Sequence, residues 1–268
     1  MNVCVAGKNN IAVEVLKYLI KNNKGRYNLH VICNESRGEI IGFQKSLADC
    51  AQNNSVPLVQ LEEVYEYEDL IFLSMEFDKI IHPSKFKDAR LFNVHFSLLP
   101  AYKGMYTSAI PILNGEAYSG VTFHRIDAGI DTGDIIAQRK IIIEKKDTCR
   151  DLYQKYLDNA IELVLSCLED VLAKRETAKR QPAEGASYYG KGYIDYSNLK
   201  LNLRDVAVSV ERQIRAYSFR EYQMPSLCGE GIIACEVTDT KSEFKPVTLV
   251  QENEMCFEVA SIDYNVIL

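Results

Sequence analysis

The first half of the chain alternates short apolar runs with segments whose apolar residues recur every three or four positions. The apolar runs have strand length and predict β-strands at residues 2–6, 29–33, 56–59, 69–75 and 89–96. Helical spacing predicts a helix at 10–23 and a second at 41–51, the first through Ile11, Val15, Leu16, Leu19 and Ile20. This alternation predicts an α/β fold: a Rossmann-like, mostly parallel sheet with helices on both faces.

The second half adds strands at 121–123 and 135–143 and then a long helix. Asp147 and Thr148 are both candidate caps for this helix, and Asp151 follows Thr148 at the spacing of a capping box. A charged stretch at 174–182 ends in proline and indicates a surface linker. Beyond it we expect a helix at 204–217 and strands at 232–237, 247–250 and 256–260. The chain should therefore divide into a Rossmann-like domain, residues 1–180, and a small C-terminal α+β domain, residues 181–268.

Composition narrows the class of protein. A chain of 268 residues with 47% hydrophobic residues can bury a full core. A net charge of −6 makes nucleic acid an unexpected partner, because phosphate contacts require basic surface. No apolar stretch has the length of a membrane span, and the first residues predict a strand rather than a secretion signal. The 8 cysteines include no Cys-x-x-Cys pair, which favours buried thiols in a reducing cytoplasm and no metal site.

Three polar residues in the middle of the chain carry the candidate chemistry. Asn93 and His95 stand two apart on an extended segment, so their side chains point to the same face. Asp131, in a separate loop next to glycines, is able to join them. Such a set can hold an oxyanion and move a proton. Taken singly, Asn93 is better explained as a strand-end cap and Asp131 as a turn residue that binds backbone. Taken as one ordered pattern, the three residues favour catalysis.

The sequence around these residues resembles that of the folate-dependent formyltransferase family. The resemblance runs through Asn-x-His-x-Ser-Leu-Leu-Pro at 93–100, Leu-Asn-Gly at 113–115, Thr-Phe-His at 122–124 and Asp-Thr-Gly-Asp at 131–134. It implies formyl transfer from 10-formyltetrahydrofolate to an amine, with Asn93, His95 and Asp131 as catalytic residues. Asn93 would donate to the oxyanion, while either His95 or Asp131 would receive the amine proton. His124 either braces the Asp131 loop or is a core histidine bonded to backbone.

The resemblance also suggests where the ligands bind. The folate would contact Ile81, Leu99, Asp127 and Asp131. A phosphate or pyrophosphate would lie at the turn between the first strand and the first helix, against Lys8, Asn9 and Asn10; the alternative there is an ordinary Asn helix cap. The remaining substrate contacts expected by family position are Lys103, Gly104, Tyr106 and Tyr222.

Within the family, segments 74–78 and 220–223 resemble bacterial dTDP-sugar N-formyltransferases. This resemblance implies a cytoplasmic homodimer that formylates a dTDP-linked amino-6-deoxysugar for O-antigen or another surface glycan. The 3-amino sugar is favoured over the 4-amino isomer. The alternatives are a methionyl-tRNA formyltransferase, a non-catalytic protein that binds folate or a nucleotide sugar, and hydrolysis of the formyl donor.

Overall fold

The computed structural model describes residues 1–34, 42–227, 229–253 and 256–268. The chain forms two compact units, and it passes between them several times. The first unit comprises residues 1–104, 120–141 and 155–188, and the second comprises 105–119, 142–154 and 189–268. The predicted boundary between residues 180 and 181 stays a prediction.

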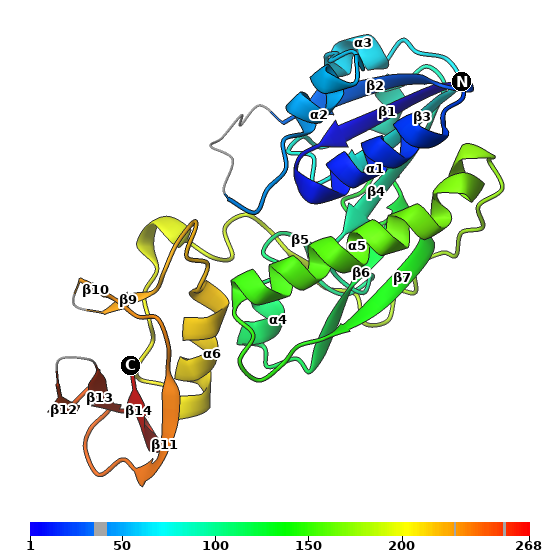
Figure 1. Ribbon diagram of the computed structural model, residues 1–268. Helices are drawn as coiled ribbons and strands as arrows, with labels where there is room; N and C mark the ends of the chain where they lie inside the picture. The colour runs from blue at the N-terminus through cyan, green and yellow to red at the C-terminus, as the bar shows by residue number, and fades with distance from the viewer. Residues whose placement is uncertain (35–41, 228, 254–255) are drawn as a thin grey trace. The chain divides into compact units, whose positions relative to one another are not determined.

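A six-stranded sheet in the order β2-β1-β3-β4-β6-β7 organises the first unit (Figure 1). Four of its six strands, β1 to β4, are parallel to one another. The fifth in this order, β6, runs antiparallel to β4. Long apolar runs form the central strands because both faces of the sheet are covered. The strands are β1 (Asn2–Gly7), β2 (Asn28–Cys33), β3 (Leu70–Met75), β4 (Ala89–His95), β6 (Tyr118–Arg125) and β7 (Ile135–Ile142).

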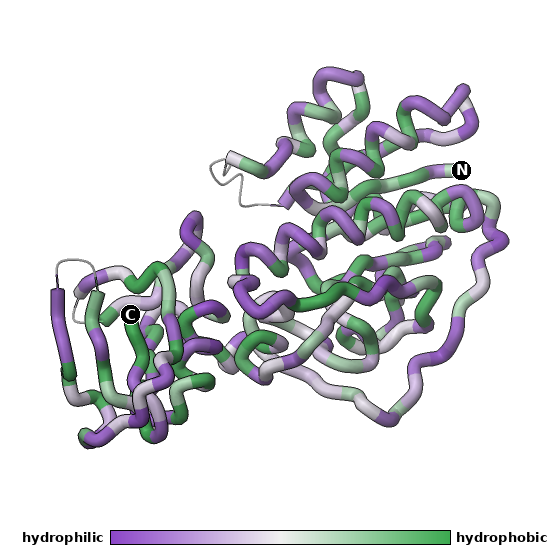
Figure 2. Tube along the Cα trace, turned by 60° about the horizontal axis from the view of Figure 1, so that its bottom comes forward, coloured by the Kyte–Doolittle hydropathy of each residue, from purple (hydrophilic) through white to green (hydrophobic). Residues whose placement is uncertain are grey.

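Helices cover both faces of this sheet. On one face α1 (Asn9–Asn22) lies beside α5 (Cys149–Leu172), and Tyr18 Oη donates to Glu169 Oε1 over 3.1 Å (Figure 1). On the other, α3 (Leu61–Val64) packs on a buried cluster that includes Cys4 and Phe72. Figure 2 shows the strands as largely hydrophobic and the helices as alternately polar and apolar. The unit is completed by α2 (Leu47–Asn53) and η1 (Pro83–Lys85).

Local chemistry accounts for the start of the long helix. Thr148 Oγ1 accepts from the Asp151 amide at 3.2 Å, and Asp151 Oδ2 accepts from the Thr148 amide at 2.9 Å. This reciprocal pair is the predicted capping box, and it places the first helical residue at Cys149.

Two predicted elements were wrong. The helix expected at 41–51 begins only at Leu47, because the Ser46 hydroxyl accepts from the Asp49 amide and caps it there; Ile41 lies outside the described residues. The strand expected at 56–59 is a single bridge between Val31 and Leu58. Pro57 lacks the N–H that a continuing ladder needs, which explains why the pairing stops.

The second unit combines a helix with short strands. A four-stranded sheet in the order β11-β14-β13-β12 packs against α6 (Ala207–Tyr217) around Val210, Ile214 and Val266. Its strands are β11 (Glu236–Lys241), β12 (Leu249–Glu252), β13 (Phe257–Ala260) and β14 (Tyr264–Ile267). The smaller elements here and at the edge of the first unit are β5 (Lys103–Gly104), α4 (Ile110–Leu113), β8 (Tyr188–Tyr189), η2 (Tyr196–Asn198), β9 (Ser226–Leu227) and β10 (Glu230–Gly231).

The strand positions in this second unit were predicted less well. The expected strand at 232–237 is replaced by β10 and β11, and β14 was missed. Most of β11 is exposed, so it carries no apolar alternation to reveal it. The α/β class, the mostly parallel sheet and the C-terminal α+β part are nevertheless confirmed. In the described part of the chain, no helix is long and apolar enough to cross a membrane.

We expect Gly7→Ala to destabilise the first unit strongly. Gly7 has φ +143°, and a Cβ there would lie 1.9 Å from the Met75 carbonyl oxygen on β3. Such overpacking should lower the free energy of unfolding by about 3 kcal/mol in urea titrations. Gly25→Ala is the matched control: it also has positive φ, yet no described atom lies within 4 Å of its Cβ position, so its loss should be about 1 kcal/mol. Equal losses would contradict this account.

Candidate active site

Pairing of two sheet strands brings the candidate residues together. Asn93 and His95 lie on β4 and point to the same face. The antiparallel register pairs Asn93 with His124 on β6. The loop after β6 then brings Asp131 to the same place, where the Asn93 amide nitrogen is 3.5 Å from Asp131 Oδ1. The sequence-predicted set Asn93, His95 and Asp131 is therefore assembled in the first unit.

The hydrogen bonds of His95 define which of its nitrogens accepts a proton. Nε2 donates to the Tyr102 carbonyl oxygen at 2.8 Å. In the neutral ring Nδ1 therefore carries a lone pair, and it lies 3.5 Å from Asp131 Oδ2. Burial lowers the pKa of His95, and this outweighs the raising effects of Asp131 and the Tyr102 carbonyl. At neutral pH His95 is thus an uncharged base with Nδ1 facing a carboxylate.

Asp131 is held ionised in a largely buried position. Burial alone raises its pKa, but attraction by His95, together with His124 and the Gly104 amide, lowers the pKa to about 2. The Gly104 N–H donates to Oδ2 at 2.9 Å. Asp131 has a left-handed backbone, φ +54°, and Gln181 Nε2 donates to its carbonyl oxygen at 2.8 Å.

His124 shows one of the two roles that the sequence left open. Its Nδ1 donates to the Arg125 carbonyl oxygen at 2.7 Å, as in a core histidine bonded to backbone. Its Nε2 then accepts from the Asn93 amide at 3.2 Å and lies 3.6 Å from Asp131 Oδ1. The ring therefore orients the Asn93 amide, and it donates to Asp131 only when it is protonated.

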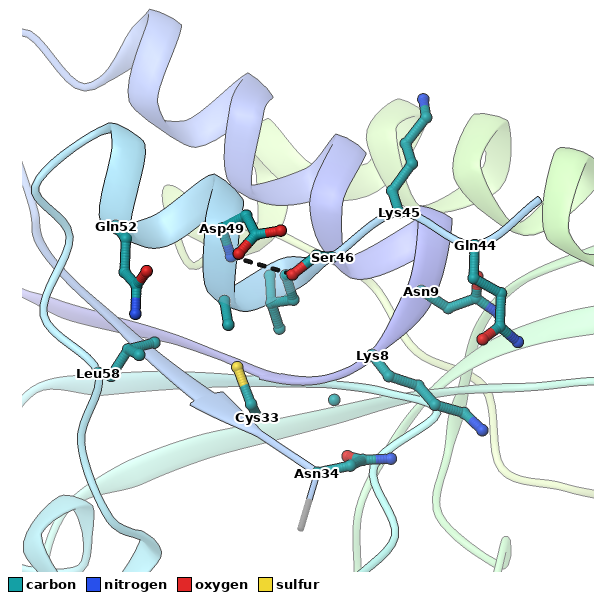
Figure 3. A pocket seen from close by; sticks show the side chains of 13 residues that line it. Lys8, Asn9, Cys33, Asn34, Gln44, Lys45, Ser46, Asp49, Gln52 and Leu58 are labelled. Atoms are coloured by element: carbon teal, nitrogen blue, oxygen red, sulfur yellow. Dashed lines mark hydrogen bonds between the residues drawn. The ribbon is translucent and has the colours of Figure 1, made fainter. Parts of the chain in front are cut away.

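Two cavities lie beside this sheet, and the second is lined by residues of β4 and β6. The first, about 320 Å³, lies at the carboxyl ends of β1 and β2 beside α2, and Figure 3 shows Lys8 and Asn34 on one side of it and Ser46 and Asp49 on the other. The second, about 340 Å³, is lined by Pro83, Phe86, Ala89, Arg90, Leu91, Phe92, Arg125 and Ile126.

Residues predicted at the phosphate turn are placed differently from one another. Lys8 and Asn9 line the first cavity, and Asn9 Nδ2 donates to Glu76 Oε2 at 3.1 Å. Asn10 instead turns its side-chain oxygen to the Lys45 amide. The cap of α1 is Lys8, whose side chain makes no capping bond. The Asn9 side-chain oxygen does accept from the Asn10 amide at 2.9 Å, so an Asn does bind a backbone amide at this turn. The choice between the phosphate site and the Asn cap stays open.

The predicted folate contacts occupy three settings. Ile81 is buried in the cluster against which Phe86 and Ile126 pack. Leu99 is buried too, and its carbonyl oxygen accepts from Gln138. Asp127 is a turn residue whose Oδ1 accepts from Thr132 Oγ1 at 2.5 Å. Phe86 and Ile126 also line the second cavity, so the cluster that contains Ile81 adjoins that cavity.

The remaining predicted substrate residues are divided between the units. Gly104 joins the candidate cluster through its amide, which donates to Asp131, and Lys103 pairs through its backbone with Ser187. Tyr106 belongs to the second unit, where its hydroxyl donates to the Lys191 carbonyl oxygen. Tyr222 is in that unit too, 51% exposed and edge-on to Phe219. Their contacts with substrate stay predictions.

Sequence reasoning missed two partners of the cluster. The Tyr102 carbonyl sets the tautomer of His95, and a backbone oxygen leaves no trace in the sequence. Gln181 was treated as part of a linker, although its amide reaches the Asp131 loop. Across residues 1–34, 42–227, 229–253 and 256–268, no group of three or more His, Cys, Asp or Glu side chains is placed to hold a metal ion.

This fold and this cluster define a formyltransferase. Residues 1–168 match the family described as formyl transferase, and the chain belongs to that family. The predicted class of enzyme is thereby confirmed.

Individual relatives refine the comparison. The chain is 41% identical to the N-formyltransferase of Helicobacter canadensis solved with folinic acid and dTDP-3-aminofucose, with a TM-score of 0.88 over 99% of this chain and 97% of that one. It is 39% identical to WlaRD, a sugar 3N-formyl transferase solved in the presence of dTDP and 5-N-formyl-THF, with a TM-score of 0.89 over 100% and 96%. Methionyl-tRNA formyltransferase of Coxiella burnetii is 26% identical over 97% of this chain and 87% of its own.

The lowered pKa of Asp131 predicts a pH-dependent contribution to stability. Its ordinary pKa is 3.8 and its folded pKa about 2, so the carboxylate stabilises the folded state above pH 3.8. That contribution, about 2 kcal/mol, is lost as the pH falls from 3.8 towards 2. The difference in unfolding free energy between wild type and Asp131→Asn should shrink over this range in urea titrations. Asp158→Asn, on the exposed side of α5, controls for removal of a charge; a difference independent of pH would refute the assignment.

Proposed function

We propose that this protein transfers the formyl group of 10-formyltetrahydrofolate to the amine of a dTDP-linked amino-6-deoxysugar, with the 3-amino isomer as acceptor. The observation that carries the proposal is the cluster of an uncharged, buried His95 and an ionised Asp131 beside the Asn93 amide. The similarity to a complex with dTDP-3-aminofucose and to a sugar 3N-formyl transferase supports the class of acceptor.

The cluster supplies each proton and charge that formyl transfer requires. The acceptor amine attacks the formyl carbon, and a C–N bond forms while negative charge develops on the formyl oxygen. Asn93 has two amide hydrogens, of which one is bound to His124 Nε2 and the other points weakly towards Asp131 over 3.5 Å. The second hydrogen is the one available to the oxyanion, a contact worth roughly 3 kcal/mol in comparable acyl transfers.

The proton then passes through His95. Nδ1 takes the proton from the attacking amine, and the ionised Asp131 at 3.5 Å stabilises the imidazolium. Collapse of the intermediate breaks the bond from the formyl carbon to N10 of the folate. His95 returns the proton to N10, so tetrahydrofolate leaves with an uncharged N10–H group. His95 is then uncharged again and ready for the next cycle.

The second cavity suits the flat ring system of the folate. Phe86, Leu91 and Ile126 offer it apolar surface, and Ile126 begins the loop that carries Asp131. A pterin held against Ile126 would direct its formyl group towards the catalytic residues. This placement follows the proposed chemistry, and Ile81 supports it from the adjoining core.

The first cavity suits the nucleoside diphosphate. The sheet register aligns Gly7 with Met75 and Met75 with Val94, the residue between Asn93 and His95. Two strand spacings of about 4.8 Å therefore separate the cavity edge from the catalytic residues, roughly 10 Å. A diphosphate that links sugar and nucleoside spans such a distance, with the Lys8 ammonium offsetting its charge. A formamido sugar for a surface glycan would be the product, and we expect the enzyme to act as a homodimer.

Turnover with a panel of amine acceptors tests this proposal. Purified protein and 10-formyltetrahydrofolate should release tetrahydrofolate with dTDP-3-amino-3,6-dideoxyhexose, and less with its 4-amino isomer. His95→Ala should lower kcat by about 10²- to 10⁴-fold, since the proton acceptor is removed, whereas His82→Ala, on an exposed residue, should leave kcat unchanged.

The panel includes initiator methionyl-tRNA, because the curated relatives at 26% identity carry that name. Formylation of the tRNA without any sugar product would replace the proposed acceptor. Release of formate without acceptor would indicate hydrolysis of the donor, and binding of folate without turnover would indicate a protein that only binds.

Lys8→Ala should raise KM for the sugar nucleotide about tenfold and change kcat little, because Lys8 would contact the diphosphate far from the reacting atoms. Lys45→Ala is the matched control. Lys45 lines the same cavity, but its ammonium lies 2.6 Å from Glu14 and is already compensated. Steady-state kinetics with varied sugar nucleotide measure both. An equal rise in KM for both variants would remove the specific role of Lys8.

A further inference from the structure

Residues 174–182, here called the strap, follow α5 and return along the edge of the sheet. The backbone of Lys179 pairs with that of Ile135 on β7 through two hydrogen bonds of 2.7 and 2.8 Å. The Glu176 side chain is only 1% exposed, and its Oε1 accepts from both Arg90 and Arg125. Since a buried carboxylate with two guanidinium partners is costly to displace, the strap is fixed to the sheet at two points.

This fixed strap ends at the loop that carries Asp131. Gln181 Nε2 donates to the carbonyl oxygens of Asp131 and Gly133, each at 2.8 Å. The loop is closed beneath them by the Arg125 amide, which donates to the Asp134 carbonyl oxygen. At Gly133 the backbone passes so close to Arg125 that an added Cβ would lie 1.8 Å from its carbonyl oxygen.

The loop needs such support because Asp131 adopts the left-handed backbone conformation, φ +54°. This conformation is unfavourable for residues other than glycine. One side chain that bonds two carbonyl groups on either side of Thr132 fixes this conformation. It does so at a cost, because Gln181 Oε1 is buried with no hydrogen-bond partner among the described residues. A side chain kept for packing alone would not leave a buried amide oxygen unsatisfied.

We propose that Gln181 is a positioning residue: its amide holds the Asp131 backbone so that the carboxylate lies between His95 and His124. The strap thereby couples the end of α5 to the catalytic cluster. The catalytic consequence rests on the proposed formyl transfer, whereas the placement of Asp131 does not.

Gln181→Met tests the placement, because methionine keeps the length of the side chain and removes both donors without adding charge. The groups that face His95 are Asp131 from the loop, His124 from β6 and the Tyr102 carbonyl. Withdrawal of Asp131 removes the attraction that favours protonated His95, so its pKa should fall by about half a unit or more. NMR titration of the ring C–H signals measures this without substrate, and only four histidines need assignment.

Gln138→Met is the matched control. Gln138 Nε2 also donates to two oxygens, those of Leu99 and the Thr122 hydroxyl, but it has no bond to Asp131. It should lower the melting temperature about as much as Gln181→Met while the titration of His95 stays in place. An unchanged His95 titration in Gln181→Met would overturn the proposal.

Steady-state kinetics test the effect of Gln181 on turnover separately from the placement of Asp131. Gln181→Met should lower kcat by about tenfold to a hundredfold with little change in KM, because misplacing a reacting group by about 1 Å costs on this order. Gln181→Lys, which still donates to the two carbonyl groups, should restore most of kcat. A loss of kcat in Gln181→Lys at a wild-type melting temperature would overturn the donor role, and this variant also decides if Gln181→Met does not fold.

A displaced His95 titration in a protein that formylates no acceptor would support the positioning role of Gln181 and reject the proposed function. Formylation by the wild-type protein, together with an unchanged His95 titration in Gln181→Met, would support the proposed function and reject the positioning role.

Discussion

The buried carboxylate of Asp131 is the charge around which the candidate active site is arranged. Removing a carboxylate from water is costly unless other groups replace its hydration. Here the Gly104 amide, the imidazole of His95 and the Asn93–His124 pair surround it. The resulting attraction exceeds the cost of burial, since the pKa of Asp131 falls to about 2. The positive φ of Asp131 and the anchoring by Gln181 serve to bring the carboxylate to this position.

The sheet provides the geometry that this charge requires. Alternation along β4 puts Asn93 and His95 on one face, and the antiparallel pairing with β6 puts His124 opposite Asn93. β6 is also the strand that breaks the parallel order of the sheet. Because it runs back along β4, its following loop returns over the same face, and Asp131 reaches Asn93, 38 positions earlier in the chain.

Much of this was predictable from the sequence, and the failures have definite causes. Most strands and the two long helices of the first unit follow from apolar periodicity. The ordered motif from Asn93 to Asp134 predicted residues that the fold brings together, and their catalytic roles stay a proposal. Leu58 looked like part of a strand because its apolar neighbours outweighed Pro57. The exposed strand β11 has no buried face, so its sequence shows no alternation of apolar and polar residues. Gln181 lies in a charged stretch that resembles a linker, and only the buried Glu176 shows that this stretch is fixed.

The same electrostatic arrangement bears on how the acceptor loses its protons. An alkyl amine is mostly protonated at neutral pH and is then no nucleophile. With His95 uncharged and Asp131 ionised, the site carries one net negative charge, which attracts an ammonium group. In the proposed reaction, the first proton of the bound ammonium passes through His95 Nδ1 to solvent. This leaves a reactive amine and an uncharged His95 that can take the second proton during attack. A doubly neutral pair would not attract the ammonium, and a protonated His95 would repel it. Both pKa values are lowered: the low pKa of Asp131 keeps the carboxylate ionised, and the low pKa of His95 keeps the imidazole uncharged. In the proposed reaction this combination attracts the ammonium form of the acceptor and leaves His95 able to take a proton.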